Sequence, residues 1–351
     1  MSALFTPITL KGVTLRNRVV VPPMCQYSAA DGMANDWHLV HYGSLAAGGA
    51  GAVILEATAI SPEGRITPYD LGLWNDVQVD NLTRILGFIS SQGAVPAVQI
   101  AHAGRKACTD RPWLGGKPLN NWSPIYAPSA IAFDEKSQIP KELSVSQIHE
   151  LTEKFAESAN RAVRAGAAIV ELHAAHGYLL SEFLSPLSNR REDEYGSTFE
   201  NRGRFLIETV QAIQSAVGSS VPLAVRISAT DWIDEGFTPE ESVMLSVQLK
   251  SMDVALIDVS TSGVVPYAKI PAGPGFQVPF AEKIRKEADM TVSAVGLITN
   301  CRSAEQIVKK GQADIVMIGR AHLKNHQWTI HAAKELGVEA PVPLQYLRGY
   351  T

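Results

Sequence analysis

Short apolar runs recur along the chain and alternate with longer segments whose apolar positions follow helical spacing. The runs have the continuous hydrophobicity of strands buried on both faces, because neither face of such a strand meets solvent. The intervening segments at 145–164, 199–217 and 239–251 have acidic starts and Lys or Arg later, which is typical of helices. The apolar runs lie at residues 18–21, 52–55, 95–100, 168–172, 222–227, 255–259, 291–295 and 314–318.

Eight strands, each followed by a helix, predict an α/β fold, a (β/α)8 TIM barrel formed as a single domain by residues 1–351. A doubly wound sheet is the alternative, and it would favour a Gly-x-Gly-x-x-Gly turn after the first strand. The first strand instead runs into Val21-Pro-Pro-Met-Cys25. Residues 8–15 alternate around Lys11-Gly12 and predict an N-terminal β-hairpin.

Two connections are longer than ordinary barrel loops. They span residues 105–144, after the third strand, and residues 179–198, after the fourth. Long loops in compact domains commonly serve as lids or binding loops. The first is rich in Pro, Gly, Asn and Trp, and we expect it to pass over the mouth of the barrel.

Composition narrows the class of protein. The net charge of −4 argues against nucleic acid as the main partner, because a protein that follows a phosphate backbone needs a basic surface. The three cysteines are far apart, which indicates neither a disulfide framework nor a metal motif. The chain starts without a leader pattern, and no apolar run approaches the ~18 residues that cross a bilayer. We therefore expect a cytoplasmic protein that does not insert into membranes.

The stretch from Glu171 to Tyr178 carries the most distinctive chemistry. It reads Glu-Leu-His-Ala-Ala-His-Gly-Tyr and follows a buried run, so it lies where ligands bind in α/β barrels. The N–H groups of His173 and His176 can hold an oxygen that gains negative charge, and the Tyr178 phenol can supply a proton. The alternatives are two metal ligands, two structural histidines and a half-buried tyrosine. No Cys, Asp or Glu in the turn completes a tetrahedral set, so we expect no metal.

Other strand ends carry polar or glycine positions that suit a phosphorylated ligand. Gly296 and the Gly319-Arg320 pair end the seventh and eighth strands, where barrels commonly bind phosphate. Ordinary turn glycines and a surface arginine are the alternative. Gln99 and Arg226 point inward from the third and fifth strands and would suit the polar edge of a flat heterocycle. Cys25 is a single cysteine at a strand end, so an inert and a functional role are both open.

Four motifs, in order along nearly the whole chain, resemble those of the old yellow enzyme family. The resemblance is to its bacterial, cysteine-containing branch, which includes the xenobiotic reductases. Residues 21–27 read Val-Pro-Pro-Met-Cys-Gln-Tyr, and residues 99–106 read Gln-Ile-Ala-His-Ala-Gly-Arg-Lys. The third motif is the 171–179 stretch, and the fourth is the run 183–196 continued by 200–202.

The resemblance implies a non-covalently bound FMN in the barrel. Substrate would face His173, His176 and Tyr178, with Tyr27 and Lys106 beside it. The residues implied to contact FMN are Pro23, Met24, Cys25, Ala57, Gln99, Arg226, Gly296, Gly319 and Arg320.

The implied activity is that of an NAD(P)H-dependent flavin oxidoreductase acting as an ene-reductase. NADPH or NADH would deliver hydride to the flavin N5, and the flavin would pass it to the β carbon of an activated alkene. Enones, enals and maleimides are the implied substrates, with nitro compounds and quinones as further candidates. His173 and His176 would hold the activating oxygen, Tyr178 would protonate the α carbon, and Cys25 would tune the flavin. Two other functions remain open, a flavin barrel of the tRNA dihydrouridine synthase type and a flavin-binding sensor.

The carboxyl-terminal residues 340–351 are expected at a subunit interface. They keep two tyrosines, a leucine and Arg348 after a Pro-rich lead, and Tyr and Arg are enriched at interfaces. A tail folded against its own barrel is the alternative. The resemblance implies a homodimer or homotetramer in which Arg348 reaches the substrate site of the adjacent subunit.

Overall fold

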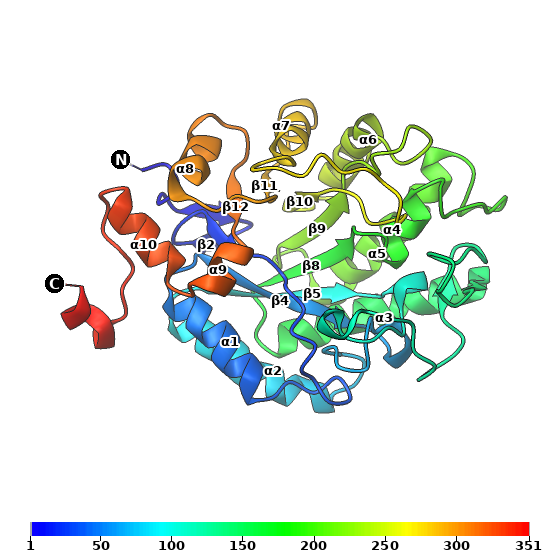
Figure 1. Cartoon of the computed structure of the whole chain (residues 1–351), viewed down its shortest axis with the longest axis horizontal. Coiled ribbons are helices and arrows are strands. Elements are labelled where there is room, and N and C mark those ends of the chain that lie inside the picture. Colours follow the sequence, from blue (N-terminus) through cyan, green and yellow to red (C-terminus); the bar gives the residue numbers. More distant parts are fainter. Residues whose placement is uncertain (1, 351) are drawn as a thin grey trace.

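Eight parallel strands close into a barrel (Figure 1). The computed structural model describes residues 2–350. Neighbours along the chain are neighbours around the ring, which closes where β12 pairs with β3. The barrel strands are β3 (Val19–Val21), β4 (Ala52–Ala59), β5 (Val95–Ala101), β8 (Ile169–Ala174), β9 (Leu223–Ser228), β10 (Leu256–Ser260), β11 (Val292–Ala294) and β12 (Ile315–Met317).

Each predicted apolar run overlaps one of these strands, so the predicted (β/α)8 barrel is confirmed. Every residue of β3, β8, β9 and β10 is buried, as their continuous hydrophobicity requires. Strand β4 continues four residues beyond its apolar run, to Ala59. It can do so because the Glu56 carboxyl accepts hydrogen bonds from the Tyr42 hydroxyl and the Gln26 backbone N–H inside the protein.

The three helices predicted from spacing are α3, α5 and α6. Each begins after a residue whose hydroxyl accepts a backbone N–H of the first turn, namely Ser144, Thr198 and Thr238. Such caps satisfy N–H groups that the helix itself leaves unpaired. The helices are α1 (Asp36–Ala47), α2 (Val77–Ser91), α3 (Val145–Arg164), α4 (Leu179–Leu184), α5 (Phe199–Val217), α6 (Pro239–Ser251), α7 (Val278–Glu287), α8 (Cys301–Lys309), α9 (Arg320–Lys324) and α10 (Trp328–Glu335), with 3-10 turns η1 (Pro62–Gly64), η2 (Gly104–Lys106), η3 (Pro112–Leu114) and η4 (Leu344–Gly349).

The predicted N-terminal hairpin closes one end of the barrel. It consists of β1 (Ile8–Leu10) and β2 (Val13–Leu15), paired antiparallel. Its buried Leu10 and Leu15 pack in one cluster with residues at the amino ends of the barrel strands, including Ala52 and Ile169. The carboxyl ends are therefore the end where a ligand can enter. Within residues 2–350, no helix is both long and apolar enough to cross a membrane.

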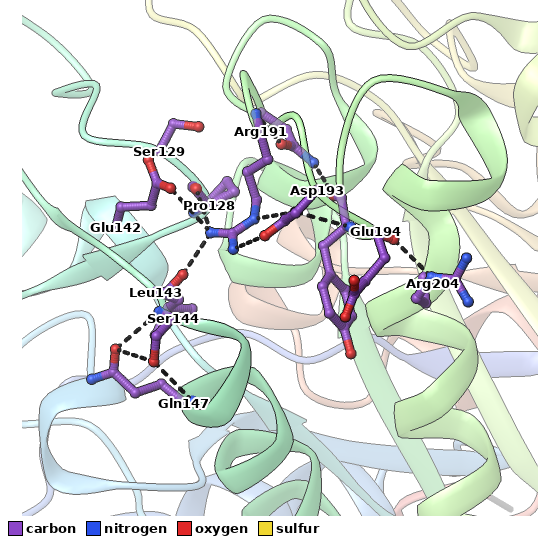
Figure 2. Close-up of polar contacts among 12 residues, drawn as sticks. Pro128, Ser129, Glu142, Leu143, Ser144, Gln147, Arg191, Asp193, Glu194 and Arg204 are labelled. Atoms are coloured by element: carbon purple, nitrogen blue, oxygen red, sulfur yellow. Dashed lines mark hydrogen bonds and ion pairs between the residues drawn. The ribbon is translucent and has the colours of Figure 1, made fainter.

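The two long connections hold each other in place. The buried Arg191 guanidinium, in the connection after β8, donates to the Leu143 carbonyl at 2.6 Å and to the Pro128 carbonyl at 3.1 Å. It also pairs with Asp193, and Figure 2 shows these contacts converging on one side chain. The connection after β5 contributes the short strands β6 (Tyr126–Ala127) and β7 (Lys141–Glu142). The connection after β8 begins with the buried helix α4. Only the remainder of residues 179–198 is therefore loop.

Candidate active site

The two histidines of the 171–178 stretch lie at the carboxyl end of β8 and face one another. His173 Nε2 and His176 Nδ1 are 3.4 Å apart. The Ala175 backbone N–H donates to His173 Nδ1, which leaves the proton of a neutral imidazole on Nε2. Ser260 Oγ lies 2.7 Å from His176 Nε2, and the Ser260 hydroxyl donates to Gln277 Oε1 at 3.3 Å. Because the hydroxyl has only one proton, Ser260 accepts from the His176 Nε2–H. His173, His176 and Ser260 thus form one chain of hydrogen bonds.

Burial keeps both imidazoles neutral. It lowers the pKa of His173 and of His176 well below the ordinary value, and the positive charge of Arg226 adds to the effect. A neutral imidazole is a hydrogen-bond donor without a full charge of its own. The pair is therefore suited to an oxygen that becomes negative during a reaction.

Tyr178 lies against this pair. Its ring centroid is 5.0 Å from that of His173, with the rings nearly perpendicular. Burial raises the pKa of the Tyr178 phenol above its ordinary value, and the nearby Cys25 and Asp70 raise it further. The hydroxyl therefore keeps its proton near neutral pH.

Lys106 connects the turn after β8 to the segment after β10. Its ammonium donates to the His176 carbonyl at 2.8 Å and to the Gly263 carbonyl at 3.2 Å, and it lies 4.9 Å from the centre of the Tyr178 ring. Burial lowers the pKa of Lys106 to about 8. The two backbones approach so closely that a Cβ on Gly177 would lie 2.1 Å from the Gly263 carbonyl oxygen.

The turn after β3 supplies Cys25 and Tyr27. Burial raises the pKa of the Cys25 thiol well above its ordinary value, so the thiol is protonated and poorly nucleophilic. Tyr27 meets Trp113 of η3 edge to face, with centroids 5.8 Å apart. This contact confirms that the 105–144 connection reaches the carboxyl end of the barrel.

A cavity of about 270 Å³ opens beside these groups. Arg226 on its wall pairs with the buried Asp258 at 3.0 Å. Six of the residues predicted to contact a flavin line the cavity, namely Pro23, Met24, Arg226, Gly296, Gly319 and Arg320.

The other three predicted flavin contacts do not line this cavity. Gln99 is buried and donates to the Glu171 carboxyl at 2.7 Å. Cys25 follows Met24 directly, and Ala57 lines a separate small cavity together with Tyr178.

Arg348 is not brought to this site within one chain. It lies in η4, in which no residue is buried, and Figure 1 places that turn at the outer edge of the molecule, beside α10. The Tyr350 hydroxyl donates to Gln327 at 2.6 Å, and the Lys334 ammonium lies over the Tyr350 ring. The tail thus contacts the last helix of its own chain.

Two buried carboxyls near the site have no role predicted from the sequence. Glu56 is one of the polar residues that end the second strand, and it holds the turn that carries Cys25 through the Gln26 N–H. Burial raises the pKa of Glu56 to about 8. Asp70 belongs to no strand or helix, and no pattern of spacing marks it. Among residues 2–350, no cluster of His, Cys, Asp or Glu is arranged to hold a metal ion.

Comparison with known proteins decides the family. Residues 3–339 match the profile of the NADH:flavin oxidoreductase / NADH oxidase family. An NADPH dehydrogenase from Geobacillus sp. (strain WCH70) is 47% identical over 349 residues, covering 99% of this chain and 98% of that protein. The chain belongs to the old yellow enzyme family. Its closed barrel is accordingly that of an NAD(P)H-dependent flavin oxidoreductase whose cofactor is FMN.

Solved structures of old yellow enzyme type share the fold. Morphinone reductase in complex with tetrahydroNAD has a TM-score of 0.79 and 26% identity, covering 97% of this chain and 93% of its own. An old yellow enzyme homologue from Zymomonas mobilis has a TM-score of 0.79 and 26% identity, covering 96% and 94%.

The residues present fit FMN. The cavity has apolar walls of proline, methionine and valine, as a flat ring system requires. Arg226 supplies a positive charge at one part of it, and Arg320 with Gly296 and Gly319 supplies a guanidinium and accessible backbone at the ends of β11 and β12. This is the donor set for a phosphate in a barrel.

Gly177→Ala should destabilise the protein and disturb the turn that carries His176. Gly177 has a φ of +68°, and a Cβ would collide with the Gly263 backbone. Positive φ costs about 1–2 kcal/mol for a residue with a side chain, and the collision adds to it. We expect a loss of at least ~2 kcal/mol in the free energy of unfolding, measured with urea.

Gly87→Ala is the matched control. Gly87 lies in the exposed interior of α2, and an added methyl group would have no heavy atom within 4 Å. The substitution should therefore gain up to about 1 kcal/mol from the higher helix propensity of alanine. Equal stability of the two variants would contradict the close packing of the Gly177 and Gly263 backbones.

Proposed function

We propose that the protein is an FMN-dependent ene-reductase that reduces the activated C=C bond of enones, enals and maleimides, with nitro compounds and quinones as further substrates. The observation that supports this best is the adjacent pair of neutral imidazoles of His173 and His176 with a protonated Tyr178 beside them. The pair suits an activating oxygen, and the phenol suits the carbon that needs a proton. When bound, FMN carries hydride from NADPH or NADH to the alkene.

His173 and His176 lower the barrier by holding the oxygen that gains charge. When hydride reaches the β carbon, negative charge spreads to the carbonyl or nitro oxygen. Two preset donors favour that charged form over the uncharged substrate, which is the condition for a rate effect. The Ala175 N–H bond to His173 and the His176 bond to Ser260 hold the two rings in place before substrate arrives.

Tyr178 completes the reaction by protonating the α carbon. A general acid must hold its proton until the transition state, and the burial of Tyr178 ensures this. Lys106 and Tyr27 border the same space. Lys106 also fixes the His176 carbonyl, so it positions the turn that carries the histidine.

Cys25 acts on the cofactor and not as a nucleophile. It follows Pro23 and Met24, which line the cofactor cavity, and its thiol remains protonated. A neutral thiol beside the flavin ring would tune the flavin potential through its contact.

Arg348 serves the adjacent subunit in a homodimer or homotetramer. The turn η4 has strongly exposed apolar side chains, with Leu344 81% and Tyr346 49% exposed. Exposed aromatic and apolar groups beside an arginine are typical of an interface. Because η4 lies at the outer edge of its own chain, the tail acts on the site of the neighbouring subunit.

Tyr178→Phe should slow alkene reduction by about 10²–10⁴-fold, the usual contribution of a general acid. Reduction of the flavin by NADPH needs no proton from Tyr178 and should be unchanged. Stopped-flow absorbance can follow the two half-reactions separately, with cyclohexenone as the alkene. Menadione, which needs no carbon protonation, is the control oxidant. Full alkene turnover in the variant would remove Tyr178 from its role.

Cys25→Ser should leave the protein folded and yellow but shift the flavin midpoint potential, measured by dye-coupled titration. The rates of the two half-reactions should change unequally, because one delivers hydride to the flavin and the other withdraws it. Cys301→Ser is the control, since Cys301 is likewise a free cysteine but lies buried in α8, away from the site. Complete loss of flavin reduction would mean that Cys25 takes a direct chemical part.

Removal of residues 343–351 should weaken both subunit association and substrate affinity while FMN stays bound. Sedimentation velocity reports the first and the KM for cyclohexenone the second. Arg348→Ala in the full-length chain should raise the KM without dissociating the oligomer, which separates the two roles of the tail. A truncated protein with the same oligomeric state in solution and the same KM would refute the proposal.

A further inference from the structure

The turn formed by residues 24–28 carries three groups of the proposed site. Met24 lines the cofactor cavity, Cys25 follows it, and Tyr27 meets Trp113 edge to face. Tyr27 has a φ of +49°, a left-handed backbone conformation that costs free energy when the residue has a side chain. Contacts from outside the turn must therefore hold it in this shape.

Glu56 of β4 holds the middle of this turn. Its side chain is buried, with 0% exposed. Its Oε2 accepts the Gln26 backbone N–H at 2.8 Å, and its Oε1 accepts the Tyr42 hydroxyl at 2.8 Å. A backbone N–H can only donate, so Oε2 accepts the bond from Gln26 whether the carboxyl is charged or protonated. A carboxyl is costly to bury unless it is hydrogen-bonded, and these bonds offset that cost.

Helix α1 fixes both the Glu56 side chain and the turn. The Tyr42 hydroxyl that donates to the carboxyl also accepts the Glu56 backbone N–H, at 3.0 Å. The Trp37 indole N–H donates to the Gln26 side chain at 3.2 Å, and that side chain donates to the Met24 carbonyl at 2.7 Å. Gln26 is thus held through its backbone by Glu56 and through its side chain by α1.

We propose that Glu56 is a positioning residue that sets the places of Cys25 and Tyr27. Gln26 lies between these two residues, so the bond that fixes its N–H fixes both neighbours. A shift of the turn would change the contact of Cys25 with the cofactor and the place of Tyr27 beside the substrate at the same time. This inference rests on the proposed roles of Cys25 and Tyr27.

Glu56→Asp tests the proposal, because it keeps the carboxyl but withdraws it by one methylene from the Gln26 N–H. The flavin midpoint potential of the holoenzyme, measured by dye-coupled titration, should shift in the same direction as in Cys25→Ala, since a misplaced thiol resembles a missing one. The KM for cyclohexenone should rise by about tenfold, the effect of one lost hydrogen bond.

Glu56→Gln separates position from charge. The glutamine keeps the length of the side chain and an oxygen that can accept the Gln26 N–H, but it cannot carry a negative charge. Both the potential and the KM should therefore stay close to those of the wild type. The reverse pattern, a shift in Glu56→Gln and none in Glu56→Asp, would mean that Glu56 acts through its charge and would overturn the proposal.

Glu305→Asp is the matched control. The Glu305 carboxyl also accepts two backbone N–H groups, those of Ala3 and Leu4, each at 2.9 Å, and none of these residues belongs to the site. Shortening this side chain should lower the free energy of unfolding but leave the potential and the KM unchanged. Equal changes of potential and KM in the two aspartate variants would show a general loss of stability and refute a positioning role.

A double-mutant cycle with Cys25→Ala provides a readout that a purely structural role would not alter. If Glu56 acts on the flavin through Cys25, the two substitutions share one effect and are not additive. Glu56→Asp should then shift the potential less in the Cys25→Ala background than in the wild type. A shift of the same size in both backgrounds would contradict action through Cys25.

Tyr42→Phe keeps the proposal falsifiable if Glu56→Asp folds poorly. It removes one bond that fixes the carboxyl and leaves every residue of the turn in place, so it should change the potential and the KM in the same directions by a smaller amount. A folded variant of either kind with the wild-type potential and KM would overturn the proposal. Failure of the proposed tuning role of Cys25 has a different signature, since Cys25→Ala would then keep the wild-type potential.

Discussion

Withdrawal of ionisable groups from water is the constraint on which this site depends. At the carboxyl ends of β3, β4 and β8, burial determines the protonation state of almost every reactive side chain. It holds the histidines neutral and the phenol and thiol protonated. In water, the imidazoles would be partly charged at neutral pH and the site would bind anions indiscriminately. The fold therefore favours neutral side chains that donate hydrogen bonds or protons over side chains that carry a fixed charge.

Close packing of backbone segments keeps these groups away from water. The Gly177 and Gly263 pair brings the turn after β8 against the segment after β10, and Lys106 binds both carbonyls. Arg191 in turn holds the two long connections together (Figure 2). These contacts fix the orientation of the histidines and the tyrosine before any ligand binds. Preorganisation of this kind is what makes donors effective in a transition state.

Much of the fold could be predicted from the sequence because each element has a local cause. Buried strands require continuous apolar runs, and α3, α5 and α6 begin at hydroxyl caps. The cavity residues Gly296, Gly319 and Arg320 could be predicted from the sequence. Once the eight strands are numbered, these residues fall at the ends of the seventh and eighth, where barrels commonly bind phosphate.

Other features depend on contacts between distant segments and leave no local pattern. The orientations of the His173 and His176 rings depend on Ala175 and Ser260, and Ser260 lies 84 residues from His176. Trp113 meets Tyr27 only because a long connection folds back over the barrel. The bond from the Gln26 N–H to Glu56 joins residues that lie 30 positions apart in the sequence.

The N-terminal hairpin determines where ligands can enter and leave the barrel. Because β1 and β2 seal the amino end of the barrel, a molecule that reacts within it must arrive and leave through one opening. The nicotinamide and the second substrate must then pass through the same opening, so each can hinder the entry of the other. The order of binding and release becomes a property of the architecture, and an excess of either compound delays the other.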